Sequence, residues 1–184
     1  MLKKENQLIA LTKRLLQEGL LRLLEAKHLD KISVTELCKE AGINRATFYN
    51  HYDSPQGLLA ELESSMAQDM EAMVRTPKTK EEMIRQMETV CTYLKKHSKT
   101  VRILIRCHAD EDLAEIFNNL DNQYTRLRLG NSQTNLDPDS IHLVSTFLYT
   151  GCYNLIMEWL VRDIPKTPRQ IAELAINIIN KEYL

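Results

Sequence analysis

The sequence lacks paired cysteines, long apolar runs and the signature motifs of common enzyme classes. Its four cysteines are Cys38, Cys91, Cys107 and Cys152. None of them forms a CxxC pair, so neither a zinc ribbon nor a disulfide framework is indicated. No apolar stretch approaches the roughly 18–20 residues that span a bilayer, and we expect no membrane contact. The N-terminal stretch has charges within its apolar pattern and no small-residue cleavage site, which predicts a cytoplasmic protein without a signal peptide.

Catalytic and metal-binding patterns are also absent from the sequence. It contains no nucleophile–base arrangement, no phosphate-binding glycine loop and no HExxH motif. We therefore predict that the protein is not an enzyme and uses no cofactor. Cys107, His108 and His142 are potential metal ligands, but nothing in their spacing supports a site, so no bound metal is predicted.

What the sequence does contain is typical of a globular chain of one or two domains. It has 184 residues, of which 43% are hydrophobic and 27% charged. The net charge of −1 conceals an asymmetry. Residues 1–52 hold nine Lys/Arg and six Asp/Glu, a balance of +3, whereas residues 53–184 hold fifteen and nineteen, a balance of −4. A basic front on an acidic body favours a head that faces a polyanion.

Apolar residues recur at three- and four-residue intervals almost throughout, which predicts an all-α fold. We expect about nine helices. They should form an N-terminal three-helix helix-turn-helix domain at residues 1–53 and a larger helical regulatory and dimerisation domain at residues 54–184. The predicted helices cover about 5–27, 33–41, 45–51, 54–73, 79–96, 98–108, 110–129, 139–161 and 168–181, with a loop at 130–138.

Several helix starts carry capping signals. Ser33 with Glu36, and Thr79 with Glu82, have the spacing of capping boxes. Pro55 stands at the first position of the predicted fourth helix, where its missing N–H costs nothing.

Residues 33–52 have the organisation of a helix-turn-helix, with two short helices joined by a glycine turn. Gly42 can adopt the positive φ of a sharp turn, and Ile43 and Phe48 should face inward. The second helix then presents a set of outward residues suited to phosphates and base edges. This set is Arg45, Ala46, Thr47, Tyr49 and His51.

The run INRATFYNHYDSPQGLL resembles the DNA-binding domain of the TetR family, and the resemblance covers roughly residues 7–60. It implies DNA contacts from a set of positions on both helices and the turn. These are Ser33, Thr35, Asn44, Arg45, Ala46, Thr47, Tyr49, His51 and Tyr52. A core position is the alternative for Tyr52. Pro55 departs from the family, which usually has a phosphate-binding Lys there, so that contact is missing or is replaced by Lys31 or Lys39.

The resemblance also implies a homodimer that forms through the last two helices, with double-stranded DNA as its other partner. The tail resembles the C-terminal domain of a TetR subgroup common in Gram-positive bacteria. The expected interface is the apolar stripe of Phe147, Leu148, Gly151, Leu155, Ile171, Leu174, Ala175 and Ile178. The alternative is that these stripes are core within one chain.

TetR-like bodies often hold a small-molecule effector, and several middle-helix residues combine polar tips with apolar bodies. The candidate pocket residues are Tyr93, Cys107, His108, Phe147 and Tyr153. Ordinary core packing of these side chains is the alternative. The sequence therefore predicts a homodimeric repressor that binds a palindromic operator and responds to an unknown effector. The alternative function is a co-regulator whose body binds a protein partner instead of a small ligand.

Overall fold

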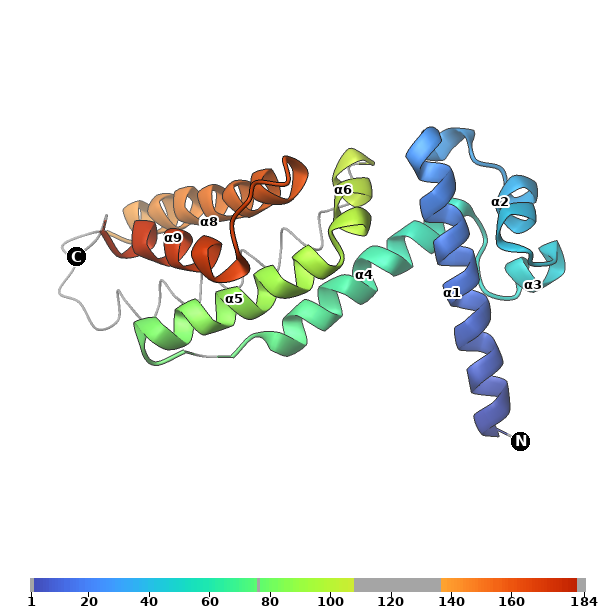
Figure 1. Ribbon diagram of the computed structural model, residues 1–184, viewed down its shortest axis with the longest axis horizontal. Helices are drawn as coiled ribbons and strands as arrows, with labels where there is room; N and C mark the ends of the chain where they lie inside the picture. The colour runs from blue at the N-terminus through green and yellow to red at the C-terminus, as the bar shows by residue number, and fades with distance from the viewer. Residues whose placement is uncertain (1, 76, 108–136, 182–184) are drawn as a thin grey trace. The chain divides into compact units, whose positions relative to one another are not determined.

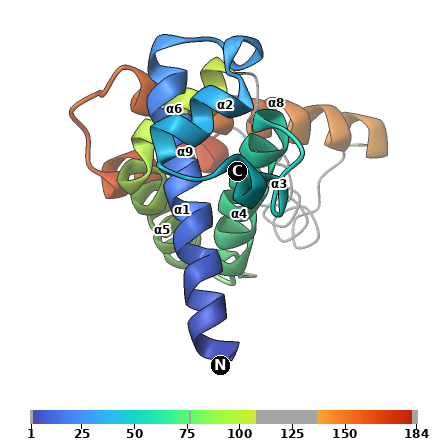
Figure 2. The ribbon, with the colours of Figure 1, turned by 90° about the vertical axis from the view of Figure 1, so that its right-hand side faces the viewer.

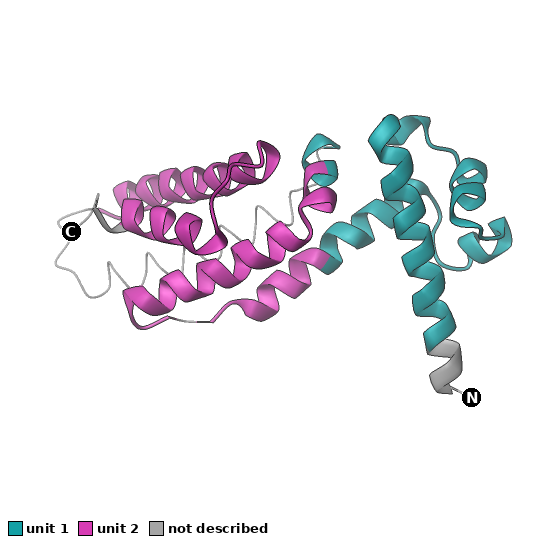
Figure 3. Ribbon diagram, viewed as in Figure 1, with its two compact units in different colours: residues 1–65, 103–110 teal, residues 66–102, 111–184 magenta. Residues whose placement is uncertain are grey.

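The computed structural model describes residues 2–75, 77–107 and 137–181, and in this part of the chain it contains eight α-helices and no strand (Figure 1). The all-α expectation is confirmed for these residues. The helix expected at 110–129 and most of the loop expected at 130–138 lie outside them. The chain divides into two compact units, residues 1–65 with 103–110 and residues 66–102 with 111–184 (Figure 3). The domain division expected at residue 53 stays a prediction.

The first unit contains α1 (Leu2–Ala26), a 3-10 turn (Leu29–Lys31), α2 (Val34–Ala41), α3 (Arg45–Tyr49) and the start of α4 (Pro55–Met73). Helix α2 packs against α1 (Figures 1 and 2). Their close approach depends on Gly19, because a Cβ there would lie 3.1 Å from the Cβ of Ala41. The core of this unit is formed by side chains that are completely buried. These are Leu16, Leu20, Leu24, Leu37, Phe48 and Leu58.

The second unit contains the remainder of α4, then α5 (Lys80–Lys96), most of α6 (Ser98–Arg106), α8 (Pro138–Val161) and α9 (Pro168–Lys181). Helices α5 and α9 lie side by side (Figure 1). Their fully buried residues include Val90, Cys91, Leu94, Ala172, Ala175 and Ile176. The core is completed by Trp159 of α8, whose indole N–H donates to the backbone oxygen of Lys166 at 3.0 Å.

A cluster of ion pairs ties the start of α9 to α5. The guanidinium of Arg169 lies 3.0 Å from Glu81, 3.3 Å from Glu88 and 2.7 Å from Glu173. The three carboxylates raise the pKa of Arg169. Because two of the three glutamates belong to α5, the cluster fixes the position at which α9 begins to pack.

The predicted N-caps at Ser33 and Thr79 and the helix start at Pro55 are confirmed, whereas the reciprocal bond of each capping box is not found. The Ser33 hydroxyl accepts from the N–H of Glu36, the Thr79 hydroxyl accepts from the N–H of Glu82, and α4 begins at Pro55. Neither glutamate side chain reaches back to the N–H of its own capping residue. Glu36 binds Lys27, and Glu82 accepts from the backbone N–H of Lys78 at 2.6 Å. None of the described helices is long and apolar enough to cross a membrane.

Candidate nucleic-acid interface

The turn between α2 and α3 is built by glycine and asparagine. Gly42 ends α2 with a φ of +67° and ψ of 28°, the left-handed conformation that glycine adopts most readily. Two residues later, Asn44 caps α3 by accepting a hydrogen bond from the N–H of Ala46 at 2.8 Å. The chain therefore reverses direction within Gly42–Asn44, and α3 starts at a fixed point relative to α2.

Helix α3 has one buried face and one exposed face. Phe48 is fully buried, and its ring meets the edge of the Tyr49 ring at a centroid distance of 5.5 Å. Tyr49 itself remains 50% exposed. Arg45 and Ala46 are exposed as well, and Thr47 is half-buried. The burial of Phe48 thus sets the rotation of α3 and turns Arg45, Ala46 and Tyr49 outward.

The basic residues of the first unit differ in how far they are neutralised. Arg22 pairs with Glu40 at 2.6 Å, and Lys27 pairs with Glu36. Lys39 and Arg45, by contrast, are exposed and make no ion pair with the described residues. The positive charge available to a polyanion therefore lies at the end of α2 and the start of α3, next to the turn.

The proline that replaces the family's usual lysine removes one cation from the start of α4. The two lysines predicted to replace this cation have different surroundings. Lys31 lies 3.6 Å from the carboxylate of Asp30, whereas Lys39 has no such partner among the described residues. Both lysines are exposed, and which of them replaces the missing phosphate contact stays a prediction.

Tyr52 occupies a different environment from Tyr49. It is 6% exposed, and its hydroxyl donates to Oε1 of Glu61 at 3.1 Å. Lys13 of α1 completes this group, since its Nζ lies 2.8 Å from Glu61 and 5.5 Å from the centre of the Tyr52 ring. Burial first, and the Glu61 carboxylate second, raise the pKa of Tyr52. Its burial supports a packing role, and its predicted contact with DNA stays a prediction.

The structure places the other predicted DNA-binding residues near the ends of the short helices. Ser33 and Asn44 are exposed, but their side-chain oxygens already accept hydrogen bonds as helix caps. Thr35 is exposed in the first turn of α2, and His51 is half-buried just after α3. Lys13 and Glu61 were missed by sequence reasoning, because no local spacing links residues 48 positions apart.

The predicted interface stripe divides into exposed and buried members. Phe147 is 68% exposed on α8, and Leu174 and Ile178 are exposed on α9. Gly151 is exposed, with open space around its Cα, and Leu155 is half-buried. The remaining members are buried within the chain, namely Leu148, Ile171 and Ala175. Part of the stripe thus packs in the core of the second unit, and the other part leaves apolar side chains exposed.

The predicted pocket residues are half-buried or exposed. Tyr93 donates its hydroxyl to Asp69 at 2.9 Å, and burial, together with that carboxylate, raises its pKa. Cys107 and Tyr153 are half-buried, and burial raises the pKa of the Cys107 thiol. Phe147, described above, is exposed, and His108 lies outside the described residues. No cluster of metal-ligating side chains occurs in the described part of the chain.

Comparison with known families accounts for most of the chain. Residues 16–62 match the family model described as "Bacterial regulatory proteins, tetR family". Residues 77–181 match the model TetR_C_8, described as "Transcriptional regulator C-terminal region". No curated protein matches the sequence at a significant level.

Solved structures of similar fold include several transcriptional regulators. A TetR transcriptional regulator from Streptococcus agalactiae 2603V is 16% identical, with 97% of this chain and 99% of that chain covered and a TM-score of 0.71. FadR from Bacillus subtilis, solved with stearoyl-CoA, is also 16% identical, with 91% and 97% covered and a TM-score of 0.65. DhaS, a dihydroxyacetone kinase operon activator, is 14% identical, with 94% and 96% covered and a TM-score of 0.62. At these identities the likeness concerns the fold.

Proposed function

The chain belongs to the TetR family of DNA-binding transcriptional regulators, and we propose that it is a homodimeric repressor of a palindromic operator. Proteins of this family are transcription factors and not enzymes. The observation that carries the proposal is the outward face of α3, where Arg45 and Tyr49 are exposed while Phe48 anchors the helix in the core. A short helix held in this way can enter the major groove and present its N-terminal residues to base edges.

The dimer is proposed to form through α8 and α9. Phe147, Leu174 and Ile178 leave large apolar surfaces in water, and their burial would contribute roughly 25 cal/mol per Å² of area covered. A second copy offers the same surface, so a two-fold axis would pair each face with itself. Gly151 supports this arrangement, because an exposed glycine on α8 permits another helix to approach closely. Two-fold symmetry in the protein requires two-fold symmetry in the operator.

The effector is proposed to bind in the second unit, which contains the predicted pocket residues Tyr93 and Tyr153. The FadR structure from Bacillus subtilis contains stearoyl-CoA, so a body of this fold is able to hold a small molecule. An effector changes DNA affinity only if it binds the DNA-competent and incompetent states with different affinity. A body that binds a protein partner is the second candidate function. The exposed apolar side chains of α8 support this second function, because any of them that the dimer leaves uncovered could bind a protein partner.

Gel-shift titrations test the DNA-binding part of the proposal. The full-length protein should form a discrete complex with DNA from the upstream region of its own gene, and affinity should fall steeply as salt rises. Arg45→Ala should weaken this complex by about 1–3 kcal/mol and relax its sequence preference. Tyr49→Phe should weaken binding to all sequences alike.

The matched control is Lys96→Ala, which removes one exposed cation from α5 in the second unit. It should leave operator affinity unchanged. Equal losses in Arg45→Ala and Lys96→Ala would mean that α3 is not the recognition element. The absence of any discrete complex in low salt would overturn the proposed operator.

A further inference from the structure

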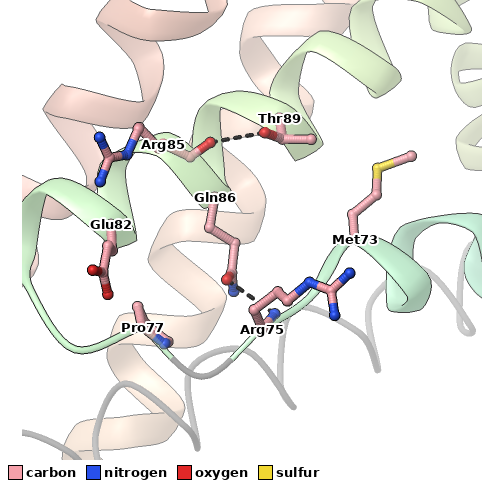
Figure 4. Close-up of a pocket in the computed structure, with 7 residues that line it drawn as sticks. All are labelled: Met73, Arg75, Pro77, Glu82, Arg85, Gln86 and Thr89. Atoms are coloured by element: carbon pink, nitrogen blue, oxygen red, sulfur yellow. Dashed lines mark hydrogen bonds between the residues drawn. The ribbon is translucent and has the colours of Figure 1, made fainter.

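A cavity of about 300 Å³ lies where the end of α4 meets the first turns of α5, within the second unit (Figure 4). None of the predicted effector-pocket residues that the structure describes lines it. Its walls come instead from Met73, Arg75, Pro77, Glu82, Arg85, Gln86 and Thr89. The volume is at the lower end of the range for small-molecule sites, which suits a ligand of a few heavy atoms.

Among the described residues, the charged groups of the lining sum to a single positive charge. Arg75 and Arg85 are exposed and make no ion pair with the described residues. Their long side chains can turn toward a bound anion. Glu82 carries the opposing charge, but Oε2 of its carboxylate is already engaged by the backbone N–H of Lys78 at 2.6 Å. One negative charge would neutralise the lining, whereas a dianion would leave the occupied site with a net negative charge.

Gln86 supplies an unused donor. Its side chain extends from α5 to the backbone of Arg75, between Met73 on one side and Pro77 and Glu82 on the other (Figure 4). Its Oε1 accepts from the N–H of Arg75 at 3.0 Å, which distinguishes the oxygen of the amide from its nitrogen. The residue is 8% exposed, and its Nε2 has no hydrogen-bond partner among the described residues. A buried donor without a partner is unfavourable, so a ligand oxygen that accepts from it would stabilise the complex.

The other polar group of the lining does not compete for this ligand as a donor. The hydroxyl of Thr89 donates to the backbone oxygen of Arg85 at 2.9 Å. The Nε2 atom of Gln86 is covered, so contact with a ligand requires a modest rotation about its last torsion. That torsion has a broad minimum in glutamine. Met73 and Pro77 add apolar surface that fits a short aliphatic group.

From this arrangement we propose that the cavity binds a small monocarboxylate with a short aliphatic part. The carboxylate accepts from Gln86 and from the guanidinium groups of Arg75 and Arg85, since charged acceptors form the stronger hydrogen bonds. The aliphatic part lies against Met73 and Pro77. This site is separate from the proposed effector pocket, and its existence does not depend on the operator or on the dimer.

Isothermal titration calorimetry on the full-length protein, without DNA, tests the proposal with butyrate as the probe. Butyrate should bind once per chain, and neither butylamine nor inorganic phosphate should bind as tightly. Arg75→Gln and Arg85→Gln should each weaken butyrate binding about tenfold, the effect expected for one charge-assisted hydrogen bond. Lys80→Gln is the matched control, because Lys80 is an exposed cation of α5 outside the lining, and it should change nothing.

A second readout reports on the unused donor directly. In the spectrum of nitrogen-15-labelled protein, the side-chain amide signal of Gln86 is identified by its absence from the variant Gln86→Met. Addition of butyrate should shift this signal. Arg75 lies outside the helices and is exposed, so Arg75→Gln should fold even if a substitution in α5 does not. The proposal is overturned by any of three results: no butyrate binding at millimolar concentration, tighter binding of phosphate or butylamine, or equal affinity in the arginine variants and Lys80→Gln.

Discussion

Replacing Gly42 with alanine should destabilise the protein through the backbone alone. A Cβ at this position would meet no heavy atom within 4 Å, so alanine introduces no clash. Its cost is the left-handed conformation at φ +67°, which is unfavourable by about 1–2 kcal/mol for a residue with a Cβ. Alanine also restricts the unfolded chain, which offsets about 0.4–1 kcal/mol of that cost. We therefore expect the free energy of unfolding to fall by about 1 kcal/mol.

Gly57→Ala is the matched control for this substitution. Gly57 lies in the first turn of α4, without a positive φ, and its Cβ would lie 3.7 Å from the Ser54 hydroxyl, an ordinary contact. Alanine is preferred over glycine in a helix by up to about 1 kcal/mol, so this variant should be at least as stable as the wild type. The free energy of unfolding should therefore be about 1–2 kcal/mol lower in Gly42→Ala than in Gly57→Ala.

The assay is urea unfolding followed by far-ultraviolet circular dichroism. All variants are compared at one protein concentration, because the stability of the proposed dimer would depend on concentration. Gly42→Asn should lose less than Gly42→Ala, since asparagine enters the left-handed region more readily. If Gly42→Ala unfolds at the same urea concentration as Gly57→Ala, the turn between α2 and α3 does not require a glycine and the reasoning fails.

Three further predictions concern the two units separately. Ile178→Glu places like charges together across a symmetric interface, so light scattering should report monomers, and a stable dimer would move the interface elsewhere. Tyr52→Phe removes the hydrogen bond to Glu61 and should lower the free energy of unfolding by about 1 kcal/mol at neutral pH. Because the pKa of Tyr52 is raised in the folded state, the wild type should lose stability more steeply than this variant above pH 10, and parallel pH profiles would contradict this. Arg169→Ala leaves three neighbouring carboxylates without their shared cation, so the melting temperature should fall more at neutral pH than near pH 4, where glutamates begin to take up protons. An equal loss at both pH values would argue against the ion-pair cluster.

Local sequence signals predicted the helix-turn-helix well because each of its parts is decided by neighbouring residues. Ser33 and Asn44 cap the helices whose first turns follow them, and Gly42 supplies the one backbone conformation that the turn needs. The ends of α1 were predicted less precisely than its existence: the predicted span is 5–27, and the helix runs over Leu2–Ala26. Periodicity places a helix reliably, but its ends fray and lack a single deciding residue.

The interface stripe shows where periodicity alone is insufficient. The predicted residues repeat at helical spacing on α8 and α9, and this spacing identifies apolar faces without saying what covers them. Leu148 and Ala175 pack within the chain, whereas Phe147 and Ile178 stay exposed. For the residues of α9, the distinction depends on where α5 lies against this helix, a contact between segments more than 70 residues apart.

The same argument explains the contrast between the two tyrosines that follow Phe48. Tyr49 and Tyr52 are three residues apart, so local sequence gives them similar helical surroundings. Their environments diverge because Glu61 of α4 and Lys13 of α1 reach Tyr52 and provide a hydrogen-bond acceptor and a cation over its ring. A phenol that finds such partners is stable in the interior, and Tyr52 is buried. Tyr49 has no acid partner of this kind among the described residues and keeps half of its surface in solvent. An exposed hydroxyl can be offered to a phosphate more readily than a buried and hydrogen-bonded one, which favours Tyr49 over Tyr52 for the predicted backbone contact.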